Sequence, residues 1–276
     1  STLLKTPKGI LAFLFCLLPI VIGFALPAAR LLILAIDKGD ARASQLLGEL
    51  IFTTVWVASL ASVIAVVLAI LIGYSRRIRG GALTGCASTA ARSGYAIPGP
   101  VIGIGLLMTL VWVDHRINDV TGSILGEDWR PGLIFTGSIA ALVIGYQTRF
   151  LAVSLSFVEA SFTRVHRRVD DAARMLGAGP TRTFFGVHFP MMRRSLLAAG
   201  LIVFVDIAKE LPITLMLRPF NFDTLAIRVY TLASDERLEE AATASLAIIV
   251  IGLIPVFLLS RHIEGRLASV SETDKR

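Results

Sequence analysis

The chain has 276 residues, of which 55% are hydrophobic and 17% are charged, and its mean hydropathy is +0.74. Soluble domains carry about 25% charged residues, so this composition excludes an ordinary soluble protein and predicts an all-α integral membrane protein. The net charge of +7 does not indicate a nucleic-acid partner, because the positions of the basic residues fit membrane topology better than a binding patch.

Six apolar segments are long enough to cross the lipid bilayer, which takes roughly 20 helical residues. The first segment is too long for a cleaved signal peptide and lacks a clear small-residue cleavage site. Because the chain starts with Ser1 and not with Met, we expect it to be a piece of a longer product. The six expected spans lie near residues 10–36, 48–73, 95–113, 132–157, 195–217 and 241–260.

The distribution of Lys and Arg predicts the orientation of these spans. If both termini are cytoplasmic, 18 of the 27 basic residues lie inside and 8 lie outside, with Arg149 of the fourth span counted inside. Lys209 is the remaining one, within the fifth span. This excess predicts cytoplasmic termini and places the long polar loop at about 159–194 in the cytoplasm.

No residue pattern indicates catalysis in this chain. A phosphate-binding loop needs Gly before Lys, and none of the five lysines follows Gly, so we expect no ATP site and no enzyme activity here. The residues alone identify no metal site. We expect the cysteines to be inert packing residues and the histidines to be solvated or interfacial: Cys16, Cys86, His115, His166, His188 and His262.

The run YAIPGPVIGIGLL, residues 95–107, begins the third expected span with small residues and prolines. Small residues let helices approach closely in lipid, and prolines free backbone carbonyls that a neighbour must satisfy. We therefore expect Pro98, Gly99, Pro100, Gly103 and Gly105 to pack at the centre of the bundle and not to form a nucleotide-binding motif.

The cytoplasmic loop contains the segment DAARMLGAGPTRTFFGVHFP, residues 171–190. The pattern predicts a helix over residues 162–176, a stop at Gly177 and Gly179, and a new short helix from Pro180, with Pro190 ending the knob. A plain connector is the alternative, but it needs no loop of this length. We expect a compact knob that contacts another protein through Asp171, Ala172, Ala173, Arg174, Gly177, Gly179 and Pro190.

The fifth expected span carries three charges, Asp206, Lys209 and Glu210, followed by Pro212. Ionisable residues at membrane depth are costly, by about 2.5–3.5 kcal/mol each on insertion scales. Their spacing places all three on one helix face, and Pro212 should kink or loosen the helix. Two interpretations stay open: a polar lining or gate of a translocation pathway, and a buried ion pair that fixes helix packing.

The segment after this span, residues 217–242, lies outside by the predicted topology. Asn221 and Asp223 stand among aromatic residues there and are candidates for contact with an extracytoplasmic binding protein. The acidic stretch 235–240 suits the start of the sixth span, because negative charge stabilises a helix N-terminus. A solvated loop with a helix cap is the alternative interpretation.

The cytoplasmic segment resembles the loop by which permease subunits of ATP-binding-cassette (ABC) importers bind their ATPase. The resemblance lies in the order of residues: acid-Ala-Ala, three residues, Gly177, nine residues, Val187, one residue, Phe189 and Pro190. The family usually has Glu at Asp171 and Leu at Phe189. The run KELPITLMLRPFNFDTL onwards, residues 209–261, is similar to the end of the permease of ferric-iron ABC importers. The first 90 residues match only in hydropathy.

This resemblance implies a type I ABC importer permease fold with six transmembrane helices. It implies that residues 1–276 form a single transmembrane permease domain, one half of a fused or paired permease. The implied partners are a cytoplasmic ATPase dimer that carries ATP and Mg, a periplasmic ferric-binding protein and a second permease half. The implied location is the bacterial inner membrane. The family's coupling residues carry over onto Asp171, Ala172, Ala173, Gly177 and Pro190.

The function expected from these observations is alternating-access import of ferric iron, driven by ATP on a separate subunit. Thiamine, a polyamine or an oxyanion are alternative cargoes, because permeases for these share the loop. A carrier of another class, coupled to ions, would use Asp206, Lys209 and Glu210 as a relay. Inverted repeats between spans 1–3 and 4–6 would favour such a carrier, and none is visible in the sequence.

Overall fold

A computed structural model describes residues 6–38 and 43–273, and every regular element within them is helical. Four basic residues used for the topology prediction, Lys5, Arg42, Lys275 and Arg276, lie outside these ranges. The twelve α-helices are α1 (Thr6–Ile20), α2 (Leu26–Lys38), α3 (Ala43–Ile78), α4 (Ala82–Ser93), α5 (Gly99–Leu125), α6 (Ile139–Arg164), α7 (Arg167–Met175), α8 (Pro180–Thr183), α9 (Phe189–Ala208), α10 (Pro212–Leu217), α11 (Leu225–Ser234) and α12 (Leu238–Thr273).

Five helical segments of the described chain are long and apolar enough to cross a membrane. The first, Lys8–Asp37, joins α1 and α2 through a π-helical turn at Val21–Ala25, and the others are parts of α3, α5, α6 and α12. They coincide with five of the six expected spans. The all-α membrane fold predicted from composition is therefore confirmed.

The span expected over residues 195–217 is not a single helix, and the kink expected at Pro212 is a complete break. The chain forms α9 and the short α10 there, separated by three residues, Lys209–Leu211. Pro212 has no N–H to donate to the carbonyl of Ala208, and it occupies the first turn of the next helix, where a missing N–H has no cost. Helix α9 therefore ends at Ala208, between the charged residues Asp206 and Lys209.

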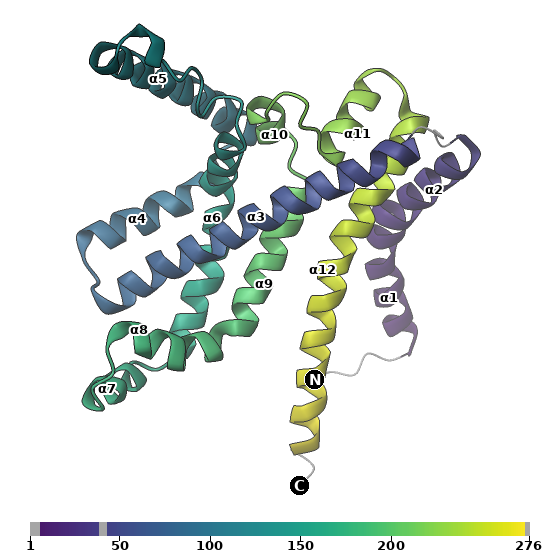
Figure 1. Ribbon diagram of the computed structural model, residues 1–276. Helices are drawn as coiled ribbons and strands as arrows, with labels where there is room; N and C mark the ends of the chain where they lie inside the picture. The colour runs from purple at the N-terminus through teal and green to yellow at the C-terminus, as the bar shows by residue number, and fades with distance from the viewer. Residues whose placement is uncertain (1–5, 39–42, 274–276) are drawn as a thin grey trace.

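Helices α3, α6 and α9 pack against one another and form the centre of the molecule (Figure 1). Four alanines of α3, Ala58, Ala61, Ala65 and Ala69, are fully buried in this packing. Small side chains allow close approach of helices, which is the main source of helix association in lipid. The three helices therefore form a tightly packed unit.

Helices α1 and α2 stand to one side of this unit, and α2 packs against α12 (Figure 1). No residue of the most apolar window of this span is buried inside the described structure. Large apolar side chains such as Phe13, Phe15 and Ile36 are exposed, as expected for side chains that face lipid.

Of the small residues and prolines near the start of α5, Gly99 and Gly103 are buried as the sequence predicts, whereas Pro98, Pro100 and Gly105 are exposed. A Cβ atom on Gly94 would lie 1.7 Å from the carbonyl oxygen of Thr148, and one on Gly103 would lie 3.0 Å from Cβ of Met216. Gly105 has no atom within 4 Å of such a position. Gly105 therefore lies outside the close packing.

The two ends of the molecule are formed by different helices. Helices α7 and α8 lie at the lower end in Figure 1, towards which α12 also runs, and α10 and α11 lie at the opposite end. This arrangement places the 159–194 loop and the 217–242 segment on opposite sides of the spans, as the topology prediction requires.

Two glycine variants test this packing. Gly94→Ala should lower the apparent melting temperature of the purified protein in detergent by roughly 2–10 °C, because over-packing typically costs about 1–3 kcal/mol. Gly105→Ala should leave it unchanged, since its added methyl group meets open space. Equal melting temperatures for the two variants would contradict the close contact between Gly94 and α6.

Candidate functional site

The loop at 159–194 forms the expected knob, with one difference at its start. The helix predicted over residues 162–176 is interrupted, because α6 ends at Arg164 and α7 starts at Arg167. His166 caps α7 by accepting a hydrogen bond from the backbone N–H of Arg168 at 3.2 Å. This break turns α7 away from the span.

Gly177 ends α7 as the sequence predicts. Its φ is +74°, a left-handed conformation that favours glycine. The Gly177 N–H donates to Arg174 O and the Ala178 N–H to Ala173 O, each at 2.9 Å. This pair of bonds is a Schellman motif. Gly179 then leads into α8, which starts at Pro180.

The prediction that Pro190 ends the knob is wrong. Helix α8 continues through a π-helical turn, Phe184–His188, into α9, and Pro190 lies in the first turn of α9. The N–H of Phe189 donates to Phe184 O across the turn. Since Pro190 cannot donate to the carbonyl four residues earlier, the wider turn lets the helix pass it without a break.

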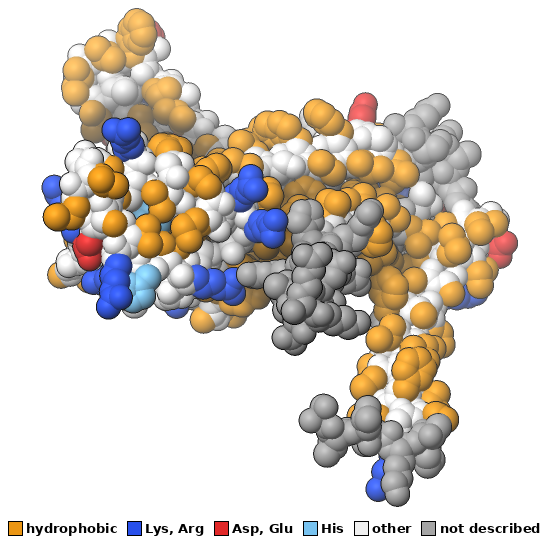
Figure 2. Space-filling model, turned by 90° about the horizontal axis from the view of Figure 1, so that it is seen from below, with side chains coloured by type: hydrophobic (Ala, Val, Ile, Leu, Met, Phe, Trp, Pro, Cys, Tyr) orange, Lys and Arg blue, Asp and Glu red, His pale blue; other side chains and the backbone are white. Residues whose placement is uncertain are grey.

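The outer surface of the knob is apolar with a basic border. Met175 and Leu176 are 89% and 86% exposed, and Phe185 is also exposed. Ala172 lies on the same helix and is exposed, and Arg182 follows on α8. Figure 2 shows hydrophobic side chains interspersed with Lys and Arg at the end of the molecule where α7 and α8 lie. An exposed apolar surface of this kind typically marks a protein contact.

Two adjacent carboxylates of α7 have different surroundings. The side chain of Asp171, the residue selected from the sequence, is 69% exposed and lies 3.9 Å from Arg174. The side chain of Asp170 is only 14% exposed, and its oxygens accept hydrogen bonds from Arg77 Nε at 2.8 Å and from His188 Nε2 at 2.6 Å. Sequence analysis missed Asp170, because its partners lie far away along the chain.

The partners of Asp170 keep it ionised. Burial by itself raises the pKa of this carboxyl, but hydrogen bonds and positive charge from Arg77 and His188 outweigh burial and hold the pKa below its usual value. With a depressed pKa in the folded state, the stabilisation from Asp170 is complete above the ordinary value of about 4. It is lost as the pH falls through the lower folded value.

The expectation that His188 is solvated or interfacial is wrong. Its side chain is fully buried, not solvated or interfacial, and its ring packs edge-on against Tyr74 and Phe162, with centroids 5.6 Å from each. The π-helical turn carries it into the contact between the knob and the spans.

The charged cluster near the end of α9 divides into two ion pairs. Lys209 Nζ lies 3.0 Å from Asp206, and the Lys209 side chain is 60% exposed. Glu210 is only 8% exposed at its side chain and pairs instead with Arg149 of α6 at 3.1 Å. The expectation that Asp206, Lys209 and Glu210 share one helix face is therefore wrong, because α9 ends before Glu210.

Glu210 connects three elements. Its carboxylate accepts a hydrogen bond from the N–H of Ile213 at 3.3 Å, and its carbonyl accepts one from Thr214 Oγ1 at 2.6 Å. Thr214 in turn bonds Tyr146 Oη at 2.7 Å. A Cβ on Gly99 would lie 2.3 Å from Arg149 Nη1, so the start of α5 presses directly on the ion pair. Pro212 follows as the first residue of α10.

The 217–242 segment contains the two candidate contact residues on its surface. Asn221 is exposed with φ of +58°, and Asp223 is half exposed and pairs with Arg218. Thr224 caps α11 by accepting a hydrogen bond from the N–H of Ile227. Two residues of the acidic stretch, Glu239 and Glu240, lie in the first turn of α12, where negative charge is expected.

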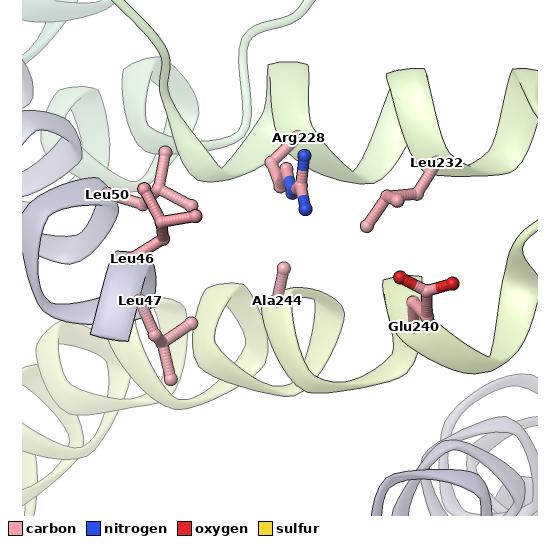
Figure 3. A pocket seen from close by; sticks show the side chains of 7 residues that line it. All are labelled: Leu46, Leu47, Leu50, Arg228, Leu232, Glu240 and Ala244. Carbon is pink, nitrogen blue, oxygen red and sulfur yellow. The ribbon is translucent and has the colours of Figure 1, made fainter. Parts of the chain in front are cut away.

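A small cavity lies between this segment and the spans (Figure 3). Arg228 of α11 and Glu240 of α12 stand on opposite sides of it, and the other lining side chains are apolar. Its volume is about 10 Å³, which is room for a single water molecule. It is therefore a packing gap at the junction of α3, α11 and α12. Within the described residues, no group of three or more His, Cys, Asp or Glu side chains is arranged to hold a metal ion.

A family model described as "Binding-protein-dependent transport system inner membrane component" matches residues 65–269. The "Fe(3+)-transport system permease protein FbpB 2" of Haemophilus influenzae is 26% identical over 168 residues, which is 61% of this chain and 30% of that relative. The chain thus spans less than a third of this relative's length. The "Putrescine transport system permease protein PotI" of Escherichia coli K12 is 23% identical over 217 residues, 77% of this chain and 71% of the relative.

Solved structures share the fold. A chain of a bacterial alginate ABC transporter, in complex with an alginate pentasaccharide-bound periplasmic protein, superposes with a TM-score of 0.69 at 14% identity, over 94% of each chain. A chain of the MetNI methionine ABC transporter in an inward-facing conformation gives 0.58 at 16% identity, over 82% of this chain and 98% of that one.

The Arg149–Glu210 pair allows a stability test. Arg149→Met or Glu210→Met alone should lower the free energy of unfolding in detergent by about 3–5 kcal/mol, because each leaves an uncompensated buried charge. The double variant should lose less than either single variant. Lys209→Ala, at an exposed pair, should cost less than about 1 kcal/mol. Losses that simply add in the double variant would show that the two side chains do not interact.

Proposed function

Because the chain belongs to the family of inner-membrane components of binding-protein-dependent transport systems, we propose that it is the permease through which an ABC importer moves ferric iron across the bacterial inner membrane. The proposal takes residues 1–276 as one transmembrane permease domain with a coupling loop at about 159–194. A second permease half, fused or separate, completes the pathway.

The exposed apolar surface of the knob is the observation that carries this proposal. Met175, the last residue of α7, and Leu176, directly after it, extend into solvent, and no residue of α7 is buried. In water such a surface is unfavourable unless a partner covers it. The proposed partner is a cytoplasmic ATPase dimer, and ATP and Mg bind there. Asp171 and Arg174 lie exposed beside this surface and can pair with charged groups of the ATPase.

Ferric iron is the preferred cargo, because the run at 209–261 resembles ferric permeases and the FbpB relatives carry that description. Putrescine is the second candidate, since PotI matches at similar identity over a larger part of its length. The proposed source of cargo is a periplasmic binding protein that contacts the segment around Asn221 and Asp223.

The proposed pathway passes the break between α9 and α10. Asp206 and Lys209 present charge beside it, and Glu210 and Pro212 lie at the break itself. A helix broken beside a charged pair offers two alternative packings, which nucleotide binding on the ATPase can bias. The proposed orientation in the membrane has both termini in the cytoplasm, on the same side as the knob.

The experiment is to reconstitute the full permease with its ATPase in liposomes and measure ATP hydrolysis with ferric-loaded, putrescine-loaded and empty binding proteins. Stimulation by the ferric-loaded form alone is the expected result. Stimulation by a protein carrying another ligand would keep the importer class and replace the cargo. Uptake that depends on membrane potential and not on ATP would contradict the proposal and favour an ion-coupled carrier.

Two glycines of the knob provide matched variants. Neither Gly177 nor Gly179 has an atom within 4 Å of an added Cβ, but only Gly177 has a positive φ. Gly177→Val should abolish uptake while membrane insertion persists, because a β-branched residue strains the left-handed conformation and displaces the end of α7. Gly179→Val should retain more uptake. Equal loss in both variants would indicate that bulk, not backbone conformation, matters at this surface.

A further inference from the structure

Helix α7 is attached to the spans through the largely buried carboxylate of Asp170. None of its nine residues is buried, and Asp170 is the one whose side chain reaches two groups from other elements. Arg174, on the same side of α7, lines a cavity of about 50 Å³ beside Tyr74 and Pro180. That volume is enough for several water molecules, so the packing beyond Asp170 is loose.

Arg77, near the end of α3, makes the contact on one side of Asp170. Its Nη1 donates to the carbonyl of Phe162 at 2.5 Å and its Nη2 to the carbonyl of Val165 at 2.8 Å. Carbonyls at the C-terminus of a helix lack partners within the helix. The same guanidinium therefore caps the end of α6 and pairs with Asp170, with its side chain only 10% exposed.

His188 makes the contact on the other side. Its Nε2 lies 2.6 Å from Asp170, while its Nδ1 is buried without a hydrogen-bond partner in the described structure. Tyr74 and Phe162 hold the ring in place, and Tyr74 Oη also donates to the carbonyl of Pro180 at 2.7 Å. Asp170 is thus the polar group that fixes the His188 ring to α7.

We propose that Arg77, Asp170 and His188 form the joint through which movement of α7 reaches α3, α6 and α9, with Asp170 as the positioning residue at its centre. The inference rests on the proposed function, because it assumes that an ATPase moves the knob. Asp170 and Asp171 then have different roles: Asp171 faces the ATPase, and Asp170 faces the spans.

The chemistry of the joint suits transmission of movement. A charge-assisted pair with several hydrogen bonds fixes direction as well as distance, whereas an apolar contact of the same size allows sliding. Each partner comes from a different element, so α7 cannot turn without breaking a bond to α3 or to the turn that leads into α9. The packed unit of α3, α6 and α9 then moves together with α7.

The test compares Asp170→Asn with Asp171→Asn in liposomes that contain the full permease, its ATPase and the ferric-loaded binding protein. Two quantities are measured: the ATPase concentration needed for half-maximal binding, and the iron taken up per ATP hydrolysed. Asp170→Asn should leave ATPase binding unchanged and lower the uptake per ATP by at least about tenfold, the effect expected for one lost charge-assisted hydrogen bond. Asp171→Asn should weaken ATPase binding and keep the uptake per ATP of the assembled complex.

His188→Phe is the second variant, because it keeps a ring between Tyr74 and Phe162 and removes only the hydrogen bond to Asp170. It should also lower the uptake per ATP, and it tests the joint even if Asp170→Asn fails to fold. Thr163→Ala, at an exposed position at the end of α6, serves as the neighbouring control.

The outcomes separate this inference from the proposed function. If the unmodified transporter couples ATP to uptake and both Asp170→Asn and His188→Phe match it, the joint is overturned and the function stands. If Asp170→Asn weakens ATPase binding as Asp171→Asn does, Asp170 belongs to the partner surface and the joint is likewise overturned. If the unmodified transporter shows no ATP-driven uptake, the proposed function fails and the inference fails with it.

Discussion

Every polar group that this chain carries into the bilayer has to find its partner within protein, because hydrocarbon offers none. That constraint explains why all regular elements of the described residues are helical. It also explains why Glu210, the charged side chain buried at the break after α9, has partners within the protein. Glu210 is satisfied by Arg149 and by the N–H of Ile213, so the break persists without leaving a carboxylate unpaired.

Close packing and polar joints divide the structure into parts. The buried alanines of α3 bring α6 and α9 close enough to form one unit, whereas α1 and α2 contact the rest mainly through α12. The knob belongs to the central unit through Arg77, Asp170 and His188. The π-helical turn at Phe184–His188 runs directly into α9, which ends at Ala208, and this is the route by which the proposed movement of the knob would reach the helix break near Glu210.

The sequence predicts features that depend on local patterns and misses those that depend on distant partners. Hydropathy locates five spans, and the run after Leu176 predicts the stop at Gly177 and the restart at Pro180. The fifth expected span, 195–217, is divided into α9 and α10 at Pro212, the residue at which the sequence predicts a kink, and hydropathy alone does not register this break. Asp170 and Asp171 are indistinguishable in sequence, and only the fold brings Arg77 and His188 to the first of them. Arg149 and Glu210 are 61 residues apart, so neither is recognisable as the other's partner.

The proposed joint requires that the knob and the spans move as one rigid body. Spin labels at Ser75→Cys on α3 and Arg167→Cys on α7, both exposed positions, report the distance across the joint after Cys16 and Cys86 are replaced by Ser. Pulsed electron paramagnetic resonance would compare the reconstituted transporter without nucleotide and trapped with ATP. A rigid joint predicts the same distance in both states, while a third label on the ATPase moves relative to both. A nucleotide-dependent shift of several ångströms between α3 and α7 would contradict it.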